Sequence, residues 1–466
     1  MPAHNESNVR HLLRRAEFVD RQARVDELLA LPSLTAAVDN VLATPANPPS
    51  VTFRGEDADW ERGEHLTHFW LDRMAHDSSR PLQERMAFFW HGHLCSEFGK
   101  VGSAELMREQ IDLYRRDGLG NLRDMVKEMS TQVAMLRYLD NNENRASSPN
   151  QNFARELMEL FLLEVGNYTE PDVEAATAAW TGHTDDWETD LYEWRNDWHD
   201  ASTKQFLGQT INNGGDPTQH GYEVIDVILG DGVIPAGAGN VANRERASRL
   251  VAAEFLSKKL WQEFADTEQP AAAIAAMRDA LVGADFDVAP WVRTMLLRDE
   301  FYSDAVKNGL VRQPTEFLVS LLVATGRRSD EASPLWLAEG TGQRLLFPPN
   351  VSGWKPNGYW VNASAMERRA AISQSFTWRV LEDYWGEGGA IELAGGGLLK
   401  DDILERIDGV PVMSGADIVD ALLALSGLWL LPATRSTIAA HLDSLSVWHR
   451  WDAVLLVFLA PENHIA

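Results

Sequence analysis

The chain has 466 residues, of which 45% are hydrophobic, and its formal net charge at pH 7 is -27. This length and composition supply enough apolar material for a large core. The negative charge, without a cluster of Lys and Arg, argues against a nucleic-acid binder, because such proteins hold phosphates with clustered cations. The single cysteine, Cys95, excludes an internal disulfide and Cys-rich metal sites, and its apolar neighbours favour a small buried side chain.

Neither end of the chain carries an obvious membrane signal. The N-terminal stretch MPAHNESNVRHLLRR has no apolar segment of the kind found in signal peptides. The longest apolar run, DALLALSGLWLLPA, is too short and too interrupted to span a bilayer. We therefore expect a cytoplasmic protein without a membrane span, or an exported one if a leader is missing from this chain.

Helical periodicity dominates the first 182 residues. Apolar residues recur at three- and four-residue spacing in 10–31, 34–43, 65–77 and 81–98. The range 103–140 predicts two helices hinged at Gly118 and Gly120, and the range 152–166 predicts a strong helix that ends at Gly166.

Regularity fails between residues 183 and 245, which are rich in Asp, Asn, Gly and Trp. Long irregular segments of this kind are usually functional or disordered. Helices resume at 246 and continue to 466, apart from a Pro- and Gly-rich loop at 345–362. The sequence thus predicts a mainly α protein with one large multi-helix domain over 1–466, long irregular loops and at most minor hairpins.

Several segments resemble, in the same order, the bacterial domain-of-unknown-function 1800 family. They include RMAFFWHGHL, NQNFARELMELFLLEVGNYTEPDVEAATAAWTGHT, SRLVAAEFLSKKLWQEF and LLFPPNVSGWKPNGYWVNASAMERRAA. The resemblance implies a largely helical, uncharacterised protein, often encoded beside a second family related to alkaline phosphatases and sulfatases. Many relatives carry export signals. Relatives often have Glu where this chain has Gln151, which weakens any role that needs a carboxylate there.

Histidines form the first candidate constellation. Five of the 13 lie between residues 65 and 93, at His65, His68, His76, His91 and His93. His-x-His at a helix end can chelate a metal, and neutral imidazole suits Zn, Cu, Fe or Ni. The alternative is that His91 and His93, beside Trp and Phe, are hydrogen-bonded packing residues.

Paired carboxylates form the second constellation. Glu156 and Glu159 are three residues apart and share a helix face, as in carboxylate metal sites of helical bundles. Arg155 can pair with Glu159 at a spacing of four. The chain has Glu-x-x-Glu here and lacks the Glu-x-x-His of di-metal sites, so structural salt bridging to Arg155, Arg14 or Arg15 competes with metal binding.

Two loops supply the remaining candidates. His199, Asp200 and Lys204 lie in the irregular segment, where a rigid scaffold commonly presents functional side chains, or where they staple the loop. The loop at 345–362 carries aromatic and amide groups of the kind that stack on and bind sugars, or a buried Trp that anchors it; these residues are Trp354, Tyr359, Trp360 and Asn362.

The Asn-rich stretch DNNENRASSPNQ follows part of a calcium-loop spacing from Asp140. Arg145 replaces the usual Gly at position six, and Gln151 replaces the bidentate Glu at position twelve. We therefore predict a hydrogen-bonded turn that stabilises the following helix without needing calcium.

These patterns favour a metal-assisted enzyme. The family resemblance alone implies its substrate, a small polar molecule such as a carbohydrate or a cell-envelope-derived compound. The alternative is a non-catalytic scaffold or binding protein that works with the product of a neighbouring gene. We expect His91 or His93 to share one polar cluster with Glu156 and His199, covered by the loops at 183–245 and 345–362.

The predicted catalytic residues are His91, His93, Glu156, His199 and Asp200. The predicted substrate-binding residues are Arg155, Lys204, Trp354, Tyr359, Trp360 and Asn362. A divalent metal ion would be held by His91, His93, Glu156 and Glu159.

Overall fold

The protein is largely helical in a computed structural model, which describes residues 2–55, 57–212, 215–331, 340–386, 389–407 and 410–465. Helix accounts for 59% of the structure. Within these ranges every sheet is a two-stranded antiparallel hairpin. The prediction of a mainly α fold with minor hairpins is therefore confirmed. In the same ranges no helix combines the length and apolar character needed to cross a membrane.

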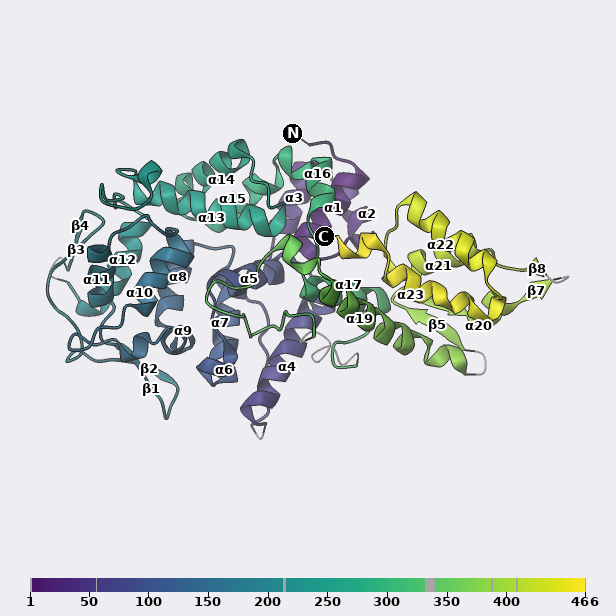
Figure 1. Cartoon of the computed structure of the whole chain (residues 1–466), viewed down its shortest axis with the longest axis horizontal. Coiled ribbons are helices and arrows are strands. Elements are labelled where there is room, and N and C mark those ends of the chain that lie inside the picture. The colour runs from purple at the N-terminus through teal and green to yellow at the C-terminus, as the bar shows by residue number, and fades with distance from the viewer. Residues whose placement is uncertain are drawn as a thin grey trace.

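The first third of the chain is a succession of helices, of which α1 to α7 lie around the middle of the molecule, whereas α8 and α9 lie toward its left end beside α10 (Figure 1). The helix predicted over 10–31 is divided because Phe18 takes a positive φ of 66°. The break at Gly118–Gly120 is as predicted, and an extended Gln132 adds a second break. The elements are α1 (Glu6–Glu17), α2 (Gln22–Leu29), α3 (Leu34–Leu42), α4 (Asp59–Asp72), α5 (Leu82–His93), α6 (Phe98–Val101), α7 (Ala104–Asp117), α8 (Leu122–Thr131) and α9 (Val133–Tyr138).

The middle third contains more regular structure than the sequence indicated. The helix predicted over 152–166 starts as α10 (Asn152–Glu156) and continues as a π-helix (Leu157–Leu162). The segment 183–245, of which residues 213 and 214 lie outside the described ranges, holds two hairpins and one helix that was not predicted. The elements are α11 (Glu170–Ala179), β1 (His183–Asp186), β2 (Leu191–Trp194), β3 (Lys204–Phe206), β4 (Gln209–Ile211), α12 (His220–Ile228), α13 (Ser248–Phe264), α14 (Ala271–Gly283) and α15 (Val288–Leu296).

In the last third, α16 and α17 lie in the middle of the molecule, and the elements from α20 to α23 form its right-hand end (Figure 1). The final residues return to the middle, near α1 and α17. Ile465 makes an antiparallel bridge with Val311 there. The elements are α16 (Asp304–Gly309), α17 (Pro314–Thr325), α19 (Ala363–Leu381), β5 (Ala390–Leu393), β6 (Gly396–Leu399), α20 (Lys400–Leu404), β7 (Arg406–Ile407), β8 (Val410–Pro411), α21 (Gly415–Ser426), α22 (Pro432–Ser444) and α23 (Ala453–Phe458).

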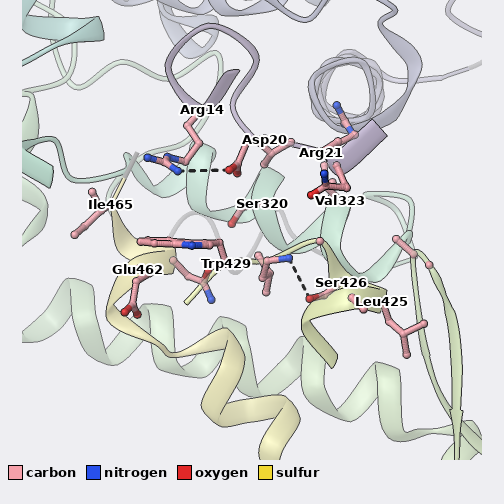
Figure 2. A pocket seen from close by; sticks show the side chains of 18 of the residues that line it. Arg14, Asp20, Arg21, Ser320, Val323, Leu425, Ser426, Trp429, Glu462 and Ile465 are labelled. Atoms are coloured by element: carbon pink, nitrogen blue, oxygen red, sulfur yellow. Dashed lines mark hydrogen bonds and ion pairs between the residues drawn. The ribbon is translucent and has the colours of Figure 1, made fainter. Parts of the chain in front are cut away.

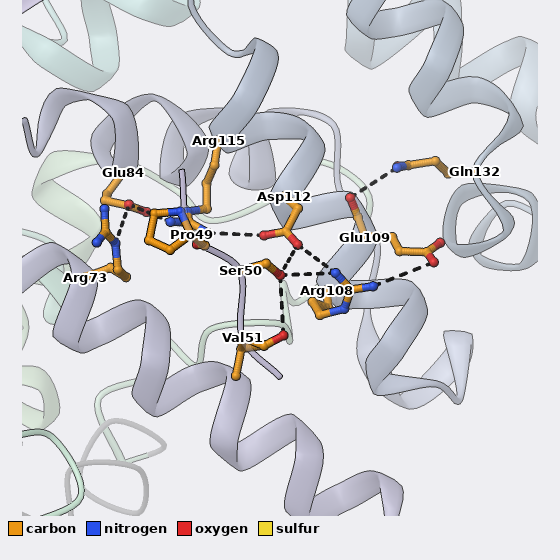
Figure 3. A network of polar contacts seen from close by, with 10 residues as sticks. All are labelled: Pro49, Ser50, Val51, Arg73, Glu84, Arg108, Glu109, Asp112, Arg115 and Gln132. Atoms are coloured by element: carbon orange, nitrogen blue, oxygen red, sulfur yellow. Dashed lines mark hydrogen bonds and ion pairs between the residues drawn. The ribbon is translucent and has the colours of Figure 1, made fainter. Parts of the chain in front are cut away.

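A continuous core joins these parts, because buried hydrophobic side chains from Val9 to Ala460 form one contact cluster. Burial of this apolar surface is the main favourable contribution to folding. The core also contains ion pairs. Glu84 of α5 is fully buried, and its carboxylate lies 3.1 Å from Arg73 Nε and 2.8 Å from Arg115 Nε (Figure 3). Arg115 also donates to the carbonyl of Pro49 at 2.7 Å, which ties the segment before α4 to α5 and α7.

The loop at 345–362 packs directly on the end of α5. The Leu346 N–H donates to His91 Nε2 at 3.2 Å, and the Phe98 N–H donates to the Leu346 carbonyl at 2.9 Å. Gly353 approaches α5 so closely that a Cβ there would lie 1.9 Å from the carbonyl oxygen of Gly92, and its φ is +72°. Only glycine fits this position. The loop therefore covers the end of α5.

Candidate functional site

His91 is a packing residue at the junction of α5 and the loop. Its side chain is fully buried and makes edge-on contacts with the rings of Trp70 and Trp354, at centroid distances of 5.6 and 5.4 Å. Because Nε2 accepts the Leu346 N–H, Nδ1 carries the proton of the neutral ring. Burial lowers the pKa of His91 to about 3, so the ring is neutral at physiological pH.

His93 lies two residues after His91 on α5 and lines a cavity. Its ring stacks on Phe89 with an interplanar angle of 3°, and its Nε2 donates to the carbonyl of Phe161 at 2.9 Å. Burial, with a smaller contribution from the charge of Lys259, lowers the pKa of His93 to about 3. His93 is thus a neutral imidazole protonated at Nε2, whose orientation is set by a backbone carbonyl.

The cavity, which we call the His93 cavity, has a volume of about 80 Å³ and lies between α5, α13 and the loop at 345–362. Its walls combine aromatic rings with amide and charged groups. The lining residues are Phe88, Phe89, Gly92, His93, Lys259, Gln262, Glu263, Gln313, Ser352, Trp354 and Pro356.

Glu263 supplies the carboxyl group of this cavity. Its Oε1 accepts a hydrogen bond from Gln313 Nε2 at 2.6 Å and lies 3.2 Å from Arg85 Nη1. Arg85 pairs more closely with Glu316, at 2.8 Å, so its charge is shared between two carboxylates. Burial, opposed by Arg85, raises the pKa of Glu263 to about 7. Its side chain keeps 17% exposure, which leaves one edge open to the cavity.

Lys259 lies one helical turn before Glu263 on the same face of α13. Its ammonium group sits 5.4 Å from the ring centroid of Phe255 and makes no ion pair or hydrogen bond within the described ranges. Burial lowers the pKa of Lys259. The cavity therefore presents a neutral histidine, a carboxyl group that titrates near neutrality and a cation that is available to a ligand.

Glu156, Glu159 and Arg155 lie elsewhere, on α10 and the π-helix. Arg155 pairs with Glu170 at 3.0 Å and reaches Glu159 at 3.8 Å, so the predicted salt bridge to Arg155 is confirmed. Glu159 also accepts the hydroxyl of Tyr168. Arg14 and Arg15 take other partners. One oxygen of Glu156 is buried without a partner, and burial together with the nearby charge of Glu159 raises the pKa of Glu156.

His199, Asp200 and Lys204 form a second polar cluster with His220, which the sequence analysis did not select. His199 donates through Nδ1 to the Thr181 carbonyl at 2.8 Å, and its Nε2 lies 2.8 Å from His220 Nδ1. Lys204 binds the Asp200 carbonyl and lies 3.8 Å from its carboxylate. These contacts fix the segment between β2 and α12 to Thr181 and to His220, which is the structural role considered as the alternative for this loop.

The structure does not assemble the predicted metal centre. His91 and His93 use their Nε2 atoms for backbone contacts, and Glu159 binds Tyr168. Among the described residues, neither histidine makes a hydrogen bond with Glu156 or His199. Across the part of the chain that the structure describes, no group of three or more His, Cys, Asp or Glu side chains is placed to hold a metal ion. His93 instead contacts the π-helix that follows α10 through the carbonyl of Phe161, and it shares its cavity with side chains of α13.

The aromatic loop residues divide into anchors and surface groups. Trp354 stacks on Phe88 at 6.2 Å and lines the His93 cavity. Trp360 is buried, whereas Tyr359 is 56% exposed. Asn362 caps α19 by accepting the Ala365 N–H at 2.9 Å. Of this predicted substrate-binding set, Trp354 alone lines the His93 cavity.

The Asn-rich turn is hydrogen-bonded, as predicted. Asn144 is fully buried, accepts the Asn150 N–H at 3.0 Å and donates to the Thr177 carbonyl at 3.0 Å. Asp140 instead pairs with Lys100 at 2.8 Å. Its carboxylate is therefore engaged by a cation, whereas a calcium ligand would need that carboxylate free. The turn thereby fixes the approach to α10.

Sequence reasoning missed Lys259 and Glu263, although both lie in SKKLWQEF, part of a segment that resembles the family. Their spacing of four was a usable signal, since it places both groups on one helix face. What the sequence could not indicate was which elements cover that face, because α5 and the loop at 345–362 are distant along the chain.

Comparison with known proteins gives a family and nothing more specific. The model of a family described as a protein of unknown function, DUF1800, matches residues 11–463. The chain belongs to this family. No curated protein and no solved structure matches it. Membership in this family leaves the activity to be argued from the site.

Proposed function

We propose that this DUF1800 protein is a hydrolytic enzyme in which Glu263 activates a water molecule in the His93 cavity. The observation that carries the proposal is the setting of Glu263, held by Gln313 and Arg85 at the wall of a cavity that also contains His93 and Lys259. Titratable groups with shifted pKa values that gather in a concave site are typical of catalytic centres.

The shifted pKa gives Glu263 the property that a general base needs. At pH 7 a carboxyl group with a pKa of about 7 is about half ionised, so it accepts and returns a proton with little thermodynamic cost. In the proposed reaction Glu263 takes a proton from water while the water oxygen attacks the substrate. Glu263 then returns this proton to the leaving group.

Lys259 supplies the complementary charge. An oxygen of the substrate gains negative charge as water attacks, and a preorganised cation stabilises that charge most in a site that excludes bulk water. Lys259 has no competing ion pair in the described ranges and lies one turn from Glu263. We therefore assign it to the developing oxyanion.

The size of the cavity restricts what enters. A water molecule occupies about 30 Å³ of liquid, so about 80 Å³ holds the water and the reacting group, while the rest of the substrate stays outside. The polar walls favour a polar group. The family resemblance suggests a carbohydrate or an envelope-derived molecule, which sets the first substrates to test.

The experiment is a hydrolysis screen of chromogenic glycosides, esters and phosphates with the full chain and with Glu263→Gln. For any substrate that is turned over, loss of a general base lowers kcat by about 10²–10⁴-fold. Glu268→Gln is the control, because Glu268 is exposed in the loop after α13. Activity that survives in Glu263→Gln at the wild-type level would contradict the proposal.

A second candidate is a non-catalytic binding protein that works with the product of a neighbouring gene. It is favoured by three exposed indoles at the C-terminal end of the molecule, Trp378, Trp385 and Trp448, with 54%, 48% and 68% exposure. Exposed aromatic residues are enriched in protein interfaces. If this candidate is correct, the triple substitution Trp378→Ser, Trp385→Ser and Trp448→Ser abolishes co-purification of the two proteins, and Glu263→Gln leaves it intact.

A further inference from the structure

A second and larger cleft lies beside α17. Its volume is about 520 Å³, within the range of about 300–1,000 Å³ that is usual for small-molecule sites. The cleft is bordered by the connection between α1 and α2, by α17, and by the C-terminal segments 424–431 and 462–465. Figure 2 shows Arg14 and Asp20 on one side of it, and Trp429 and Glu462 on the other. We call it the Arg312 cleft.

Arg312 is the most informative residue of its lining. The side chain is 4% exposed, and its guanidinium makes no hydrogen bond or ion pair with any residue the structure describes. The backbone is held firmly, since the Arg312 N–H donates to the His464 carbonyl at 2.9 Å and its carbonyl accepts from Arg369 Nη2 at 2.5 Å. Burial lowers the pKa of Arg312 to about 10, so it still carries its charge at pH 7.

A buried cation without a partner is strongly unfavourable, and proteins normally provide it with a counter-charge. The carboxylates of the lining do not fill this role. Asp20 is bound by Arg10 and Arg14, each at 3.4 Å. Glu462 accepts through Oε1 from the Leu431 N–H at 3.0 Å and the Thr434 hydroxyl at 2.6 Å. Glu316 also lies near Arg312 but pairs with Arg85 at 2.8 Å. The nearby charges of Asp20 and Glu316 are therefore shared with other arginines, and neither carboxylate contacts the Arg312 guanidinium among the described residues.

The charged residues that line the cleft are mostly cationic. Its cations are Arg14, Arg21, Lys307 and Arg312, and its carboxylates are Asp20 and Glu462. A cationic excess in a cleft is unexpected by chance in a chain whose net charge is -27. Such a surplus favours an anion, because field lines from like charges are focused in a concave site.

The remaining wall is apolar. Trp429 is 42% exposed, and the guanidinium of Arg14 lies 5.9 Å from its ring centroid. Aliphatic groups extend this surface along the cleft; they are Val19, Val323, Leu425, Leu428, Leu431 and Ile465. A simple inorganic anion would leave this surface unused.

We propose that the Arg312 cleft binds a small organic acid whose carboxylate pairs with Arg312 and whose apolar or aromatic body packs on Trp429. A guanidinium presents two parallel N–H groups that match a carboxylate, and an indole offers a large flat contact at small entropic cost. The site is independent of the proposed reaction. Arg312 and Gln313 are consecutive residues that line the two different cavities.

The test is isothermal titration calorimetry of the full chain with phenylacetate. Two further probes are acetate, which lacks the apolar body, and phenylacetamide, which lacks the negative charge. We expect binding of phenylacetate alone. Arg312→Met should weaken it by about ten- to hundredfold, since it removes a charge-assisted hydrogen bond. Arg312→Met also removes an unpaired buried charge, so its melting temperature should not fall. Trp429→Ala, at an exposed position, should weaken binding without affecting folding.

Matched controls are Arg278→Gln on α14 and Trp60→Ala on α4, which lie outside the lining. Both should bind phenylacetate like the wild type, as should Glu263→Gln. The proposal is overturned if phenylacetate does not bind, if acetate or phenylacetamide binds equally well, or if Arg312→Met keeps the wild-type affinity.

Discussion

The hydrogen-bond partners of the buried histidines come from residues that are distant in the sequence, although their burial follows from their immediate neighbours. Phe89 and Trp90 indicate burial of the neighbouring histidines, and His91 and His93 are indeed buried. Their partners, Leu346 and Phe161, are far away along the chain, so sequence alone could not identify them. A carboxylate that the sequence did not single out, Glu263, lines the same cavity as His93.

The buried neutral state of His91 makes stability depend on pH. Its pKa is about 3 in the folded protein and about 6.5 in the unfolded chain, so the unfolded chain binds a proton more readily as pH falls below 6.5. Stability is fully present above pH 6.5 and decreases toward lower pH. His91→Gln, which still accepts the Leu346 N–H, should flatten the fall in melting temperature between pH 6.5 and 5.5. An unchanged slope would show that His91 does not contribute.

Glu84 offers a test of the buried ion pairs. Glu84→Gln leaves Arg73 without its counter-charge in the core and leaves Arg115 with Asp112 alone, which should lower the free energy of unfolding by about 3–5 kcal/mol. Urea denaturation measures this loss. The control is Asp420→Asn, which breaks an exposed pair with Arg435 and should cost less than about 1 kcal/mol. Equal effects of the two substitutions would contradict this account.

At the scale of elements, periodicity predicted most helices but not their partners. The missed helix, α12, follows Gly- and Asn-rich residues that indicate a loop, although Val224, Ile225 and Ile228 give it a buried face. The loop at 345–362 was predicted as a loop and as a cover for the site. Its location on α5 depends on close contacts, such as Gly353 against Gly92, that no local pattern reveals.

Trp354 should be the main anchor of that loop. Trp354→Ala removes its contacts with Phe88 and His91 and should cost about 2–3 kcal/mol, less than for a fully buried Trp. Limited proteolysis should then cleave within 345–362, because the freed loop becomes accessible. Tyr359→Ala, at an exposed position of the same loop, is the control and should leave the cleavage pattern unchanged.

At the scale of the whole molecule, one core supports two cavities with different chemistry. The Arg312 cleft exists because the C-terminal segment returns to the N-terminal helices, where Ile465 pairs with Val311. The His93 cavity exists because α13 and the loop at 345–362 meet on α5. Neither arrangement follows from local sequence, since each joins segments that are far apart along the chain.

The central claim is that Glu263 exchanges a proton near neutral pH. It is tested most directly by infrared difference spectroscopy of the carboxyl groups, recorded for the wild type and for Glu263→Gln across pH 4–9. The account predicts one carboxyl band, absent from the variant, that titrates with a pKa of about 7. A band that titrates at the ordinary value for glutamate, about 4.3, would contradict the account, because Glu263 would then lack the proton affinity that the proposed reaction requires.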